Sequence, residues 1–493
     1  MSTRLRMVKG ASVLVFSQAI VAVATFLRNV TIARFVDAEN YGIATTFALT
    51  ISLVEMTSNL ALDRVLVQDR EGESDAMLAS AHLLQFIKAL LIAALLYVTA
   101  APIATLFNLP HLIWAFQLTA LVPLLHGLIN YDYVARQRNL EFLPTALFDA
   151  LPQLLTLLVA FAVVHVFADY RVMLAVILLQ AALHVVISHI VARRPYRWHF
   201  DRILAQRKLS FGWPILVNGL LMFGIFQGDR LIIGSHYDMA TLGWYSVAFS
   251  LCLVPSIIFA QLSGYLLMPI LSRVRDAGHS GNVYYNVTLI ACFSFAMFMV
   301  SFFAVAGAAL ISVSFGEHYL AAGSVIIWLG IMQALRVVRI APTLIANSQA
   351  RTRNGMYSNL VRSIALLLAL AFAWHEMPVM WIAVSGIAGE IIALGMSVAL
   401  LELGAAQAAF MRKFAYLGFF LALFTAGVIE LGRHITPSQN LLDNLLLVAG
   451  GALLAFSLAV LLALLNREAR AEVRQLIHGA LGRSGAAENA GGS

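Results

Sequence analysis

Six basic residues lie inside long apolar stretches of the sequence, where a charged side chain is costly. They are Arg28, Lys88, Arg230, Arg336, Arg339 and Arg362. A cation at the centre of a membrane-spanning helix costs about 2.5–3.5 kcal/mol even on the insertion scale that gives the lowest values. Guanidinium and ammonium groups bind carboxylate and phosphate oxygens. A chain that keeps several such cations is therefore predicted to bind an anionic cargo within the membrane.

The spacing of these cations places them on polar helix faces. Gln333, Arg336 and Arg339 are three residues apart, and Gln85 and Lys88 repeat that spacing. Residues three or four apart share one face of a helix. The predicted substrate-binding residues of a cationic cavity are Arg28, Lys88, Arg336, Arg339 and Arg362. Two alternatives stay open: neutral polar residues on these faces can simply join helices, and Arg362, near a helix end, can reach the membrane surface.

Three acidic residues also lie in apolar stretches: Glu55, Asp149 and Glu390. They have two interpretations. As salt-bridge partners they would neutralise some of the cations, and as ion-coupling residues they would take up a proton during transport. The abundance of acids and bases together favours the first interpretation.

The composition is that of an integral membrane protein. Of 493 residues, 61% are hydrophobic and 12% are charged, whereas soluble domains carry about 25% charged residues. Both cysteines, Cys252 and Cys292, lie in apolar stretches, so neither a disulfide framework nor a metal site is predicted. The net charge of +7 indicates topology and contact with anionic membrane lipids, not nucleic-acid binding.

Fourteen apolar stretches are long enough to cross a membrane as helices, each having the roughly 20 residues required. Their expected ranges are 10–34, 41–65, 77–100, 112–135, 143–167, 171–192, 212–235, 242–271, 284–314, 320–346, 356–375, 379–402, 413–432 and 441–465. We therefore predict an all-α integral membrane protein with about 14 transmembrane helices.

The basic residues also predict the orientation of these helices. With the stretches drawn in this way, 23 of the 32 lysines and arginines fall on one side of the membrane, and only Arg34, Arg171 and Arg433 fall on the other. Lysine and arginine are enriched in cytoplasmic loops. Both termini are therefore predicted to be cytoplasmic.

A weak internal repeat relates two segments 201 residues apart. Residues 27–42 align without gaps to 228–243, so that Asp37 matches Asp238 and Gly42 matches Gly243. The repeat divides the chain into two lobes of six predicted helices each. Because six is an even number, the first helix of each lobe enters the membrane from the same side, as in parallel-repeat transporters. The expected parts are an N-lobe at 1–192, a basic cytoplasmic linker at 193–211, a C-lobe at 212–402, two further helices at 403–466 and a cytoplasmic tail at 467–493.

The repeat also suggests an outer gate. Arg28 and Asp229 occupy equivalent positions in the first helices of the two lobes. Opposite charges at matching depth could meet when the outside is closed and part when it opens. The alternative is that each charge pairs within its own lobe, and the sequence leaves both open.

No catalytic site is predicted. The 13 histidines are scattered without metal-ligand spacing, and no nucleotide-binding motif is present. The expected connections on the outside do not exceed roughly a dozen residues, an ordinary length for links between helices. We therefore expect a non-enzyme without a cofactor.

Several short motifs resemble those of a known transporter family. They are Asn40-Tyr-Gly in the first repeat, and Phe211-Gly-Trp-Pro, Gln227-Gly-Asp-Arg-Leu-Ile-Ile-Gly and Leu242-Gly-Trp-Tyr-Ser in the second. Together with the 6+6+2 helix count, they resemble the polysaccharide-transport (Wzx-type) flippases of the multidrug/oligosaccharidyl-lipid/polysaccharide exporter superfamily. The resemblance covers essentially the whole chain.

This resemblance implies a flippase that moves an undecaprenyl-pyrophosphate-linked oligosaccharide across a bacterial inner membrane by alternating access, for exopolysaccharide, capsule or O-antigen. The implied partners are membrane lipids, the lipid-linked oligosaccharide, and a polysaccharide polymerase and co-polymerase. The alternatives are a lipid II flippase, a multidrug exporter, and a non-transporting scaffold of a polysaccharide-assembly complex. A scaffold has no need of six cations inside the membrane, and a cation-rich lumen would repel cationic drugs.

Overall fold

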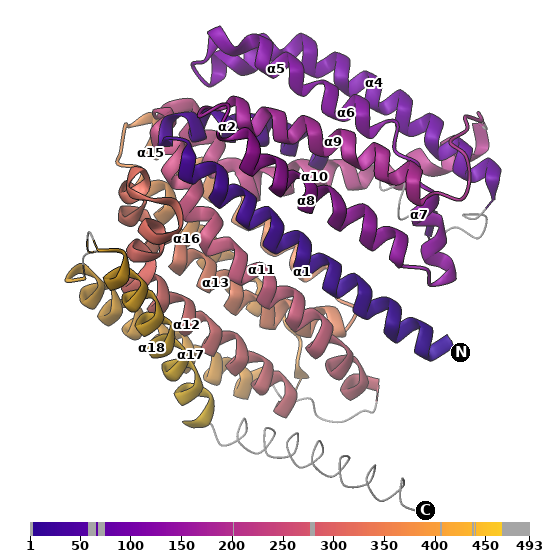
Figure 1. Cartoon of the computed structure of the whole chain (residues 1–493). Helices are drawn as coiled ribbons and strands as arrows, with labels where there is room; N and C mark the ends of the chain where they lie inside the picture. The colour runs from indigo at the N-terminus through magenta and orange to yellow at the C-terminus, as the bar shows by residue number, and fades with distance from the viewer. Residues whose placement is uncertain are drawn as a thin grey trace, which may run out of the picture. The chain divides into compact units, whose positions relative to one another are not determined.

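The computed structural model consists of helices and their connections (Figure 1). It describes residues 3–57, 66–67, 74–200, 202–276, 282–404, 407–435, 438 and 440–465. Within these ranges no strand occurs, and eleven helices are long and apolar enough to cross a membrane. The protein is therefore an all-α, multi-pass membrane protein, as the hydropathy predicts.

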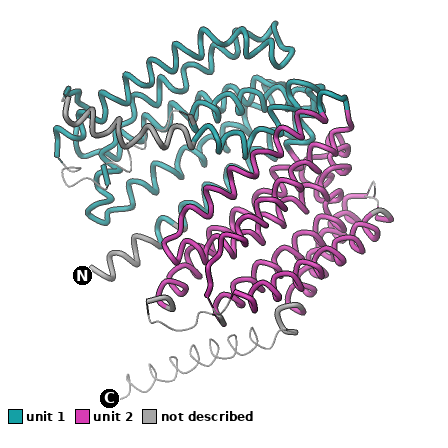
Figure 2. The backbone as a smooth tube through the Cα atoms, turned by 180° about the vertical axis from the view of Figure 1, so that it is seen from behind, with its two compact units in different colours: residues 1–246, 373–376 teal, residues 247–372, 377–493 magenta. Residues whose placement is uncertain are grey.

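The chain divides into two compact units (Figure 2). Unit 1 comprises residues 1–246 with 373–376, and unit 2 comprises 247–372 with 377–493. The helices of unit 1 are α1 (Thr3–Phe35), α2 (Ala38–Thr57), α4 (Asp75–Leu106), α5 (Ile113–Thr119), α6 (Leu121–His126), α7 (Asp132–Ala135), α8 (Leu143–Val163), α9 (Arg171–Val191) and α10 (Arg202–His236), with two 3-10 turns, η1 (Pro110–Leu112) and η2 (Arg136–Asn139).

Unit 2 is built around a buried central helix, α12, which packs against α13, α17 and α18. Its elements are most of α11 (Met239–Asp276), α12 (Asn282–Phe315), η3 (Glu317–Ala322), α13 (Gly323–Ser348), α14 (Arg353–Arg362), α15 (Ile364–Trp374), α16 (Met380–Ala399), α17 (Gln407–Arg433) and α18 (Leu441–Leu465). The first residues of α11 and the end of α15 belong to unit 1.

Two expected membrane helices are divided: residues 356–375 form α14 and α15, and the other is broken more extensively. The sequence predicts a continuous helix over 112–135, but the structure has three short helices there, α5, α6 and α7. Pro123 lies inside α6, where it has no N–H to donate to the preceding turn. Residues 127–131 are not helical, and Asn130 bonds to the 188–194 region instead. The prediction of one helix was wrong because hydropathy does not register these breaks.

Two other expected boundaries differ from the structure. Residues 202–211 of the expected linker belong to α10, where the Arg-Ile-Leu-Ala-Gln-Arg-Lys-Leu run has high helix propensity. The division into units also falls at 246/247, after α10. The division into lobes at 193–211 therefore stays a prediction from the repeat, and the predicted tail at 467–493 lies outside the described residues.

The repeated segments fold alike. Helix α1 ends at Phe35 and α2 begins at Ala38, whereas α10 ends at His236 and α11 begins at Met239. The carboxylate of Asp37 accepts the backbone N–H of Asn40 at 2.8 Å, and that of Asp238 accepts the N–H of Thr241 at 2.6 Å. Each aspartate thus caps the helix that follows it. The same corner is built twice, 201 residues apart.

Candidate anion-binding residues

In unit 2, three arginines surround one buried carboxylate. Arg336 and Arg339 lie one turn apart on α13, Arg362 ends α14, and Glu390 lies on α16. Arg336 Nε and Arg362 Nε each lie 2.8 Å from Glu390 Oε1, and Arg339 Nε lies 3.3 Å from Oε2. The structure therefore gathers three of the five predicted cations on one of the predicted acids.

Close packing of α16 brings this carboxylate to the arginines. A Cβ atom on Gly389 would lie 2.6 Å from the Cβ of Ala365 and 3.2 Å from the carbonyl oxygen of Arg362. Only glycine permits this approach, which places Glu390 beside the end of α14. Farther along the two helices, the Asn354 amide and Ser397 exchange two hydrogen bonds of 2.7 Å.

The cluster is buried, and its guanidinium groups outnumber its carboxylate. The Glu390 side chain has no exposed area, and those of Arg336, Arg339 and Arg362 are exposed by 12%, 12% and 8%. Three guanidinium groups thus make ion pairs with this single carboxylate. Arg339 Nη1 also donates to Asn359 Oδ1 at 3.1 Å. Buried charges are costly unless compensated, so the cluster favours anions.

In unit 1, Arg28 lies on α1 against α8 and α9. Its Nη1 donates to Gln153 Oε1 at 3.0 Å, to Thr156 Oγ1 at 3.2 Å and to Gln180 Oε1 at 2.6 Å. These partners were not among the predicted site residues. A signal for them was present, because Gln153 and Thr156 are polar residues three apart in an apolar stretch, but such residues commonly join helices.

The remaining predicted residues belong to unit 1. Lys88 is half-buried on α4, and Glu55 is exposed on α2. Asp149 Oδ2 on α8 accepts from Gln18 Nε2 at 3.0 Å. Asp229 Oδ2 accepts from the Tyr245 hydroxyl at 2.9 Å. The roles assigned to these residues, including the gate between Arg28 and Asp229, stay predictions.

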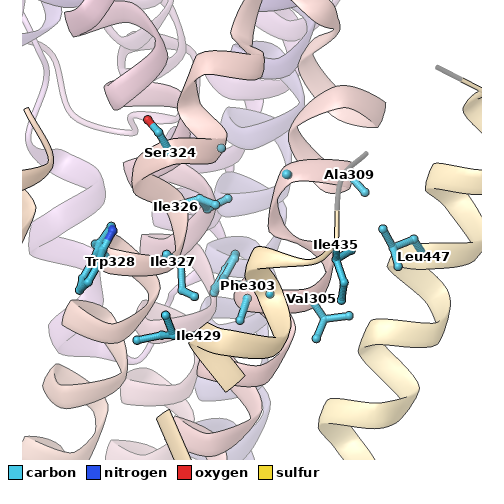
Figure 3. A pocket seen from close by; sticks show the side chains of 14 residues that line it. Phe303, Val305, Ala309, Ser324, Ile326, Ile327, Trp328, Ile429, Ile435 and Leu447 are labelled. Atoms are coloured by element: carbon cyan, nitrogen blue, oxygen red, sulfur yellow. The ribbon is translucent and has the colours of Figure 1, made fainter. Parts of the chain in front are cut away.

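Unit 2 also holds a cavity of about 230 Å³ that is lined mainly by apolar side chains; Figure 3 shows these side chains. Phe303, Ile326, Trp328 and Ile429 are among its walls, and α12, α13, α17 and α18 supply its lining. Among the described residues, no charged side chain lines it. It therefore offers no site for an anion, and the arginine cluster remains the better candidate.

The fold is that of a known class of membrane exporters. A lipid II flippase, MurJ, in an inward closed conformation is similar with a TM-score of 0.68 and 15% identity, over 91% of this chain and 98% of that one. An inward-facing multidrug transporter of the MATE family in the MOP superfamily is similar with a TM-score of 0.52 and 12% identity, over 82% and 96%. At these identities the likeness concerns the fold alone.

The sequence comparison defines the family. Residues 31–324 match the family described as "Polysaccharide biosynthesis protein", and the chain belongs to that family. A curated relative is the succinoglycan biosynthesis transport protein ExoT of Rhizobium meliloti (strain 1021), which is 23% identical over 293 residues. The aligned region covers 58% of each protein, so the chain spans less than two thirds of that relative. The named relatives are transport proteins and not enzymes.

Proposed function

We propose that this protein is a flippase for an undecaprenyl-pyrophosphate-linked oligosaccharide. It moves this cargo by alternating access across a bacterial inner membrane, with both termini in the cytoplasm, and supplies exopolysaccharide, capsule or O-antigen synthesis. A polymerase and a co-polymerase receive the cargo on the far side. The family match and the exporter fold support transport in polysaccharide biosynthesis.

The observation that carries the proposed cargo is the arginine cluster of unit 2. A pyrophosphate that links a lipid to a sugar carries one negative charge on each phosphate. The guanidinium groups that surround Glu390 outnumber its carboxylate and can bind such an anion. Arginine suits this ligand because its planar fork donates two parallel hydrogen bonds to a phosphate. Lys88 and Arg28 are the proposed cationic residues of unit 1.

A lipid II flippase would need the same pyrophosphate recognition, and the fold is similar to that of one such flippase, MurJ. The match to the polysaccharide biosynthesis family favours an oligosaccharide cargo over lipid II. The buried arginines argue against a scaffold. Charges inside the membrane destabilise the fold, and a protein that binds no anionic cargo has no use for them.

The test is the loss of export without loss of the protein. In a host that depends on this protein for polymer export, Arg336→Ala, Arg339→Ala and the double variant should abolish extracellular polysaccharide, while the membrane level of the protein stays near normal. Arg336→Lys and Arg339→Lys should restore export partly, because lysine keeps the charge but lacks the planar fork.

Arg351→Ala is the matched control. Arg351 follows the same helix, and its exposed side chain pairs with Glu402 at 2.7 Å. Removal of this exposed pair should leave export unchanged. Survival of export in both single variants and in the double variant would show that the cluster does not bind the cargo.

A further inference from the structure

The environment of Arg28 differs in kind from that of the arginine cluster in unit 2. Arg28 is only 9% exposed, and its hydrogen-bond partners are the neutral oxygens of Gln153, Thr156 and Gln180. Within the described part of the chain, no carboxylate lies at ion-pair distance from it. The cradle of neutral oxygens solvates the guanidinium but leaves its positive charge uncancelled.

The cradle consists of Gln153, Thr156 and Gln180. Other hydrogen bonds of two of these side chains orient their oxygens toward Arg28. The Thr156 hydroxyl donates to the carbonyl oxygen of Pro152 at 2.7 Å, so its oxygen is left to accept from Arg28. Gln153 Oε1 also accepts from the Thr25 hydroxyl at 3.1 Å. A hydroxyl has one donor and two acceptor sites. Because the bond to the Pro152 carbonyl uses the donor of Thr156, Arg28 Nη1 faces an acceptor site.

The three cradle bonds use only one end of the guanidinium. All of them leave from Nη1, whereas Nε is buried without a hydrogen-bond partner among the described residues. The edge formed by Nε and Nη2 is thus not used by the cradle. Two neighbouring N–H groups on one edge of arginine match two oxygens of a carboxylate or a phosphate.

A buried positive charge without an acid partner is expensive to keep. A glutamate in place of either glutamine would complete a buried ion pair, as Glu390 does in unit 2. An uncompensated buried charge destabilises the fold, so the neutral cradle is worse for stability than an acidic one. An anionic ligand that binds to Arg28 would supply the missing negative charge, which explains why the protein keeps a neutral cradle there.

We propose that Gln153, Thr156 and Gln180 are positioning residues that hold Arg28 charged and oriented for a phosphoryl oxygen of the cargo. This second phosphoryl contact belongs to unit 1, whereas the arginine cluster belongs to unit 2. The inference rests on the proposed function, because it takes the cargo to be a lipid-linked pyrophosphate.

Gln153→Glu and Gln180→Glu test this assignment, because they keep the size of the side chain and cancel the charge of Arg28. The thermal midpoint of the purified protein should stay equal or rise. Export in cells should fall at least tenfold. Binding of inorganic pyrophosphate to the full-length protein in lipid nanodiscs, measured by titration calorimetry, should weaken at least tenfold.

Gln137→Glu is the control, since that amide donates to Thr145 Oγ1 outside the cradle, and it should keep parental affinity. Thr156→Val serves if the glutamate variants do not accumulate. It removes one acceptor at constant shape and should weaken pyrophosphate binding two- to fivefold at a normal membrane level.

Parental affinity and export in the glutamate variants, or in Thr156→Val, would overturn the inference and make the cradle a structural contact only. If Arg336→Ala abolishes export at the same time, the proposed function survives and the cradle assignment alone fails. If neither set of variants affects export, the proposed function fails as well.

Discussion

Gly42 and Gly243 lie against each other's helix so closely that neither position has room for a side chain. A Cβ atom on Gly42 would lie 1.8 Å from the carbonyl oxygen of Met239, and one on Gly243 would lie 1.9 Å from that of Ala38. The two glycines are 201 residues apart, and so are the two carbonyls. The repeats therefore meet in a reciprocal contact near the starts of α2 and α11.

Alanine at either glycine should separate these helices. We expect Gly42→Ala and Gly243→Ala each to destabilise the protein by about 1–3 kcal/mol, as overpacked sites do, and the double variant to lose less than the sum because both act on one contact. Thermal unfolding followed by tryptophan fluorescence measures this. Gly418→Ala, with no atom within 4 Å of the added carbon, should be neutral or stabilising. Equal midpoints for Gly42→Ala and Gly418→Ala would contradict the close contact.

Glu390→Gln should destabilise unit 2 strongly. Without its carboxylate, three buried guanidinium groups each lose an ion pair, and loss of one partner from a buried ion pair costs about 3–5 kcal/mol. Glu402→Gln is the control. The Glu402 side chain, which pairs with Arg351, is 75% exposed, and such an exposed ion pair contributes at most about 1 kcal/mol to the free energy of unfolding. Arg362→Gln combined with Glu390→Gln should recover part of the loss. If Glu390→Gln is as stable as Glu402→Gln, the cluster does not depend on this carboxylate.

The predicted orientation can be tested with one cysteine at the start of α2 and another in the connection before α10. Cysteine in place of the exposed Glu39 should react with an impermeant thiol reagent applied to intact cells, and cysteine in place of the exposed Phe200 should react only after permeabilisation. The native Cys252 and Cys292 are fully buried and should give little background. The opposite labelling pattern would reverse the assigned topology.

The outer-gate hypothesis and the neutral cradle predict different results for one exchange of charges. Arg28→Asp and Asp229→Arg should each impair export. If the two residues pair in another conformation, the double exchange should restore export. We expect it to stay inactive, because Arg28 Nη1 already has three oxygen partners and Asp229 accepts from Tyr245. Recovery to more than half of parental export would favour the gate.

The sequence predicts the helices well where hydropathy is continuous and less well where backbone chemistry intervenes. The corners before α2 and α11 follow from the matched Asp37 and Asp238, because a capping aspartate acts locally. The break in the stretch 112–135 cannot be predicted in this way, since Pro123 sits among leucines and valines that keep the hydropathy high. Local patterns therefore locate helix starts better than they locate breaks.

The site residues show the same division between local and long-range information. The spacing of Arg336 and Arg339 predicts a shared face because both lie on one helix. Their meeting with Arg362 and Glu390 depends on how α13, α14 and α16 pack, which the sequence pattern does not encode. Gln153 and Gln180 were missed because the pattern does not distinguish a glutamine that holds a charge from one that joins two helices.

The arginine cluster also constrains how the chain enters the membrane during synthesis. Glu390 lies 54 residues after Arg336 and 51 after Arg339, so α13 is made before its counter-charge exists. At about 5–20 residues per second, the ribosome needs roughly 3–10 s to reach Glu390. During that interval two arginines in one segment oppose partition into lipid by about 5–7 kcal/mol. Helix α13 should therefore wait beside the translocon until α16 emerges, and the two should leave it together.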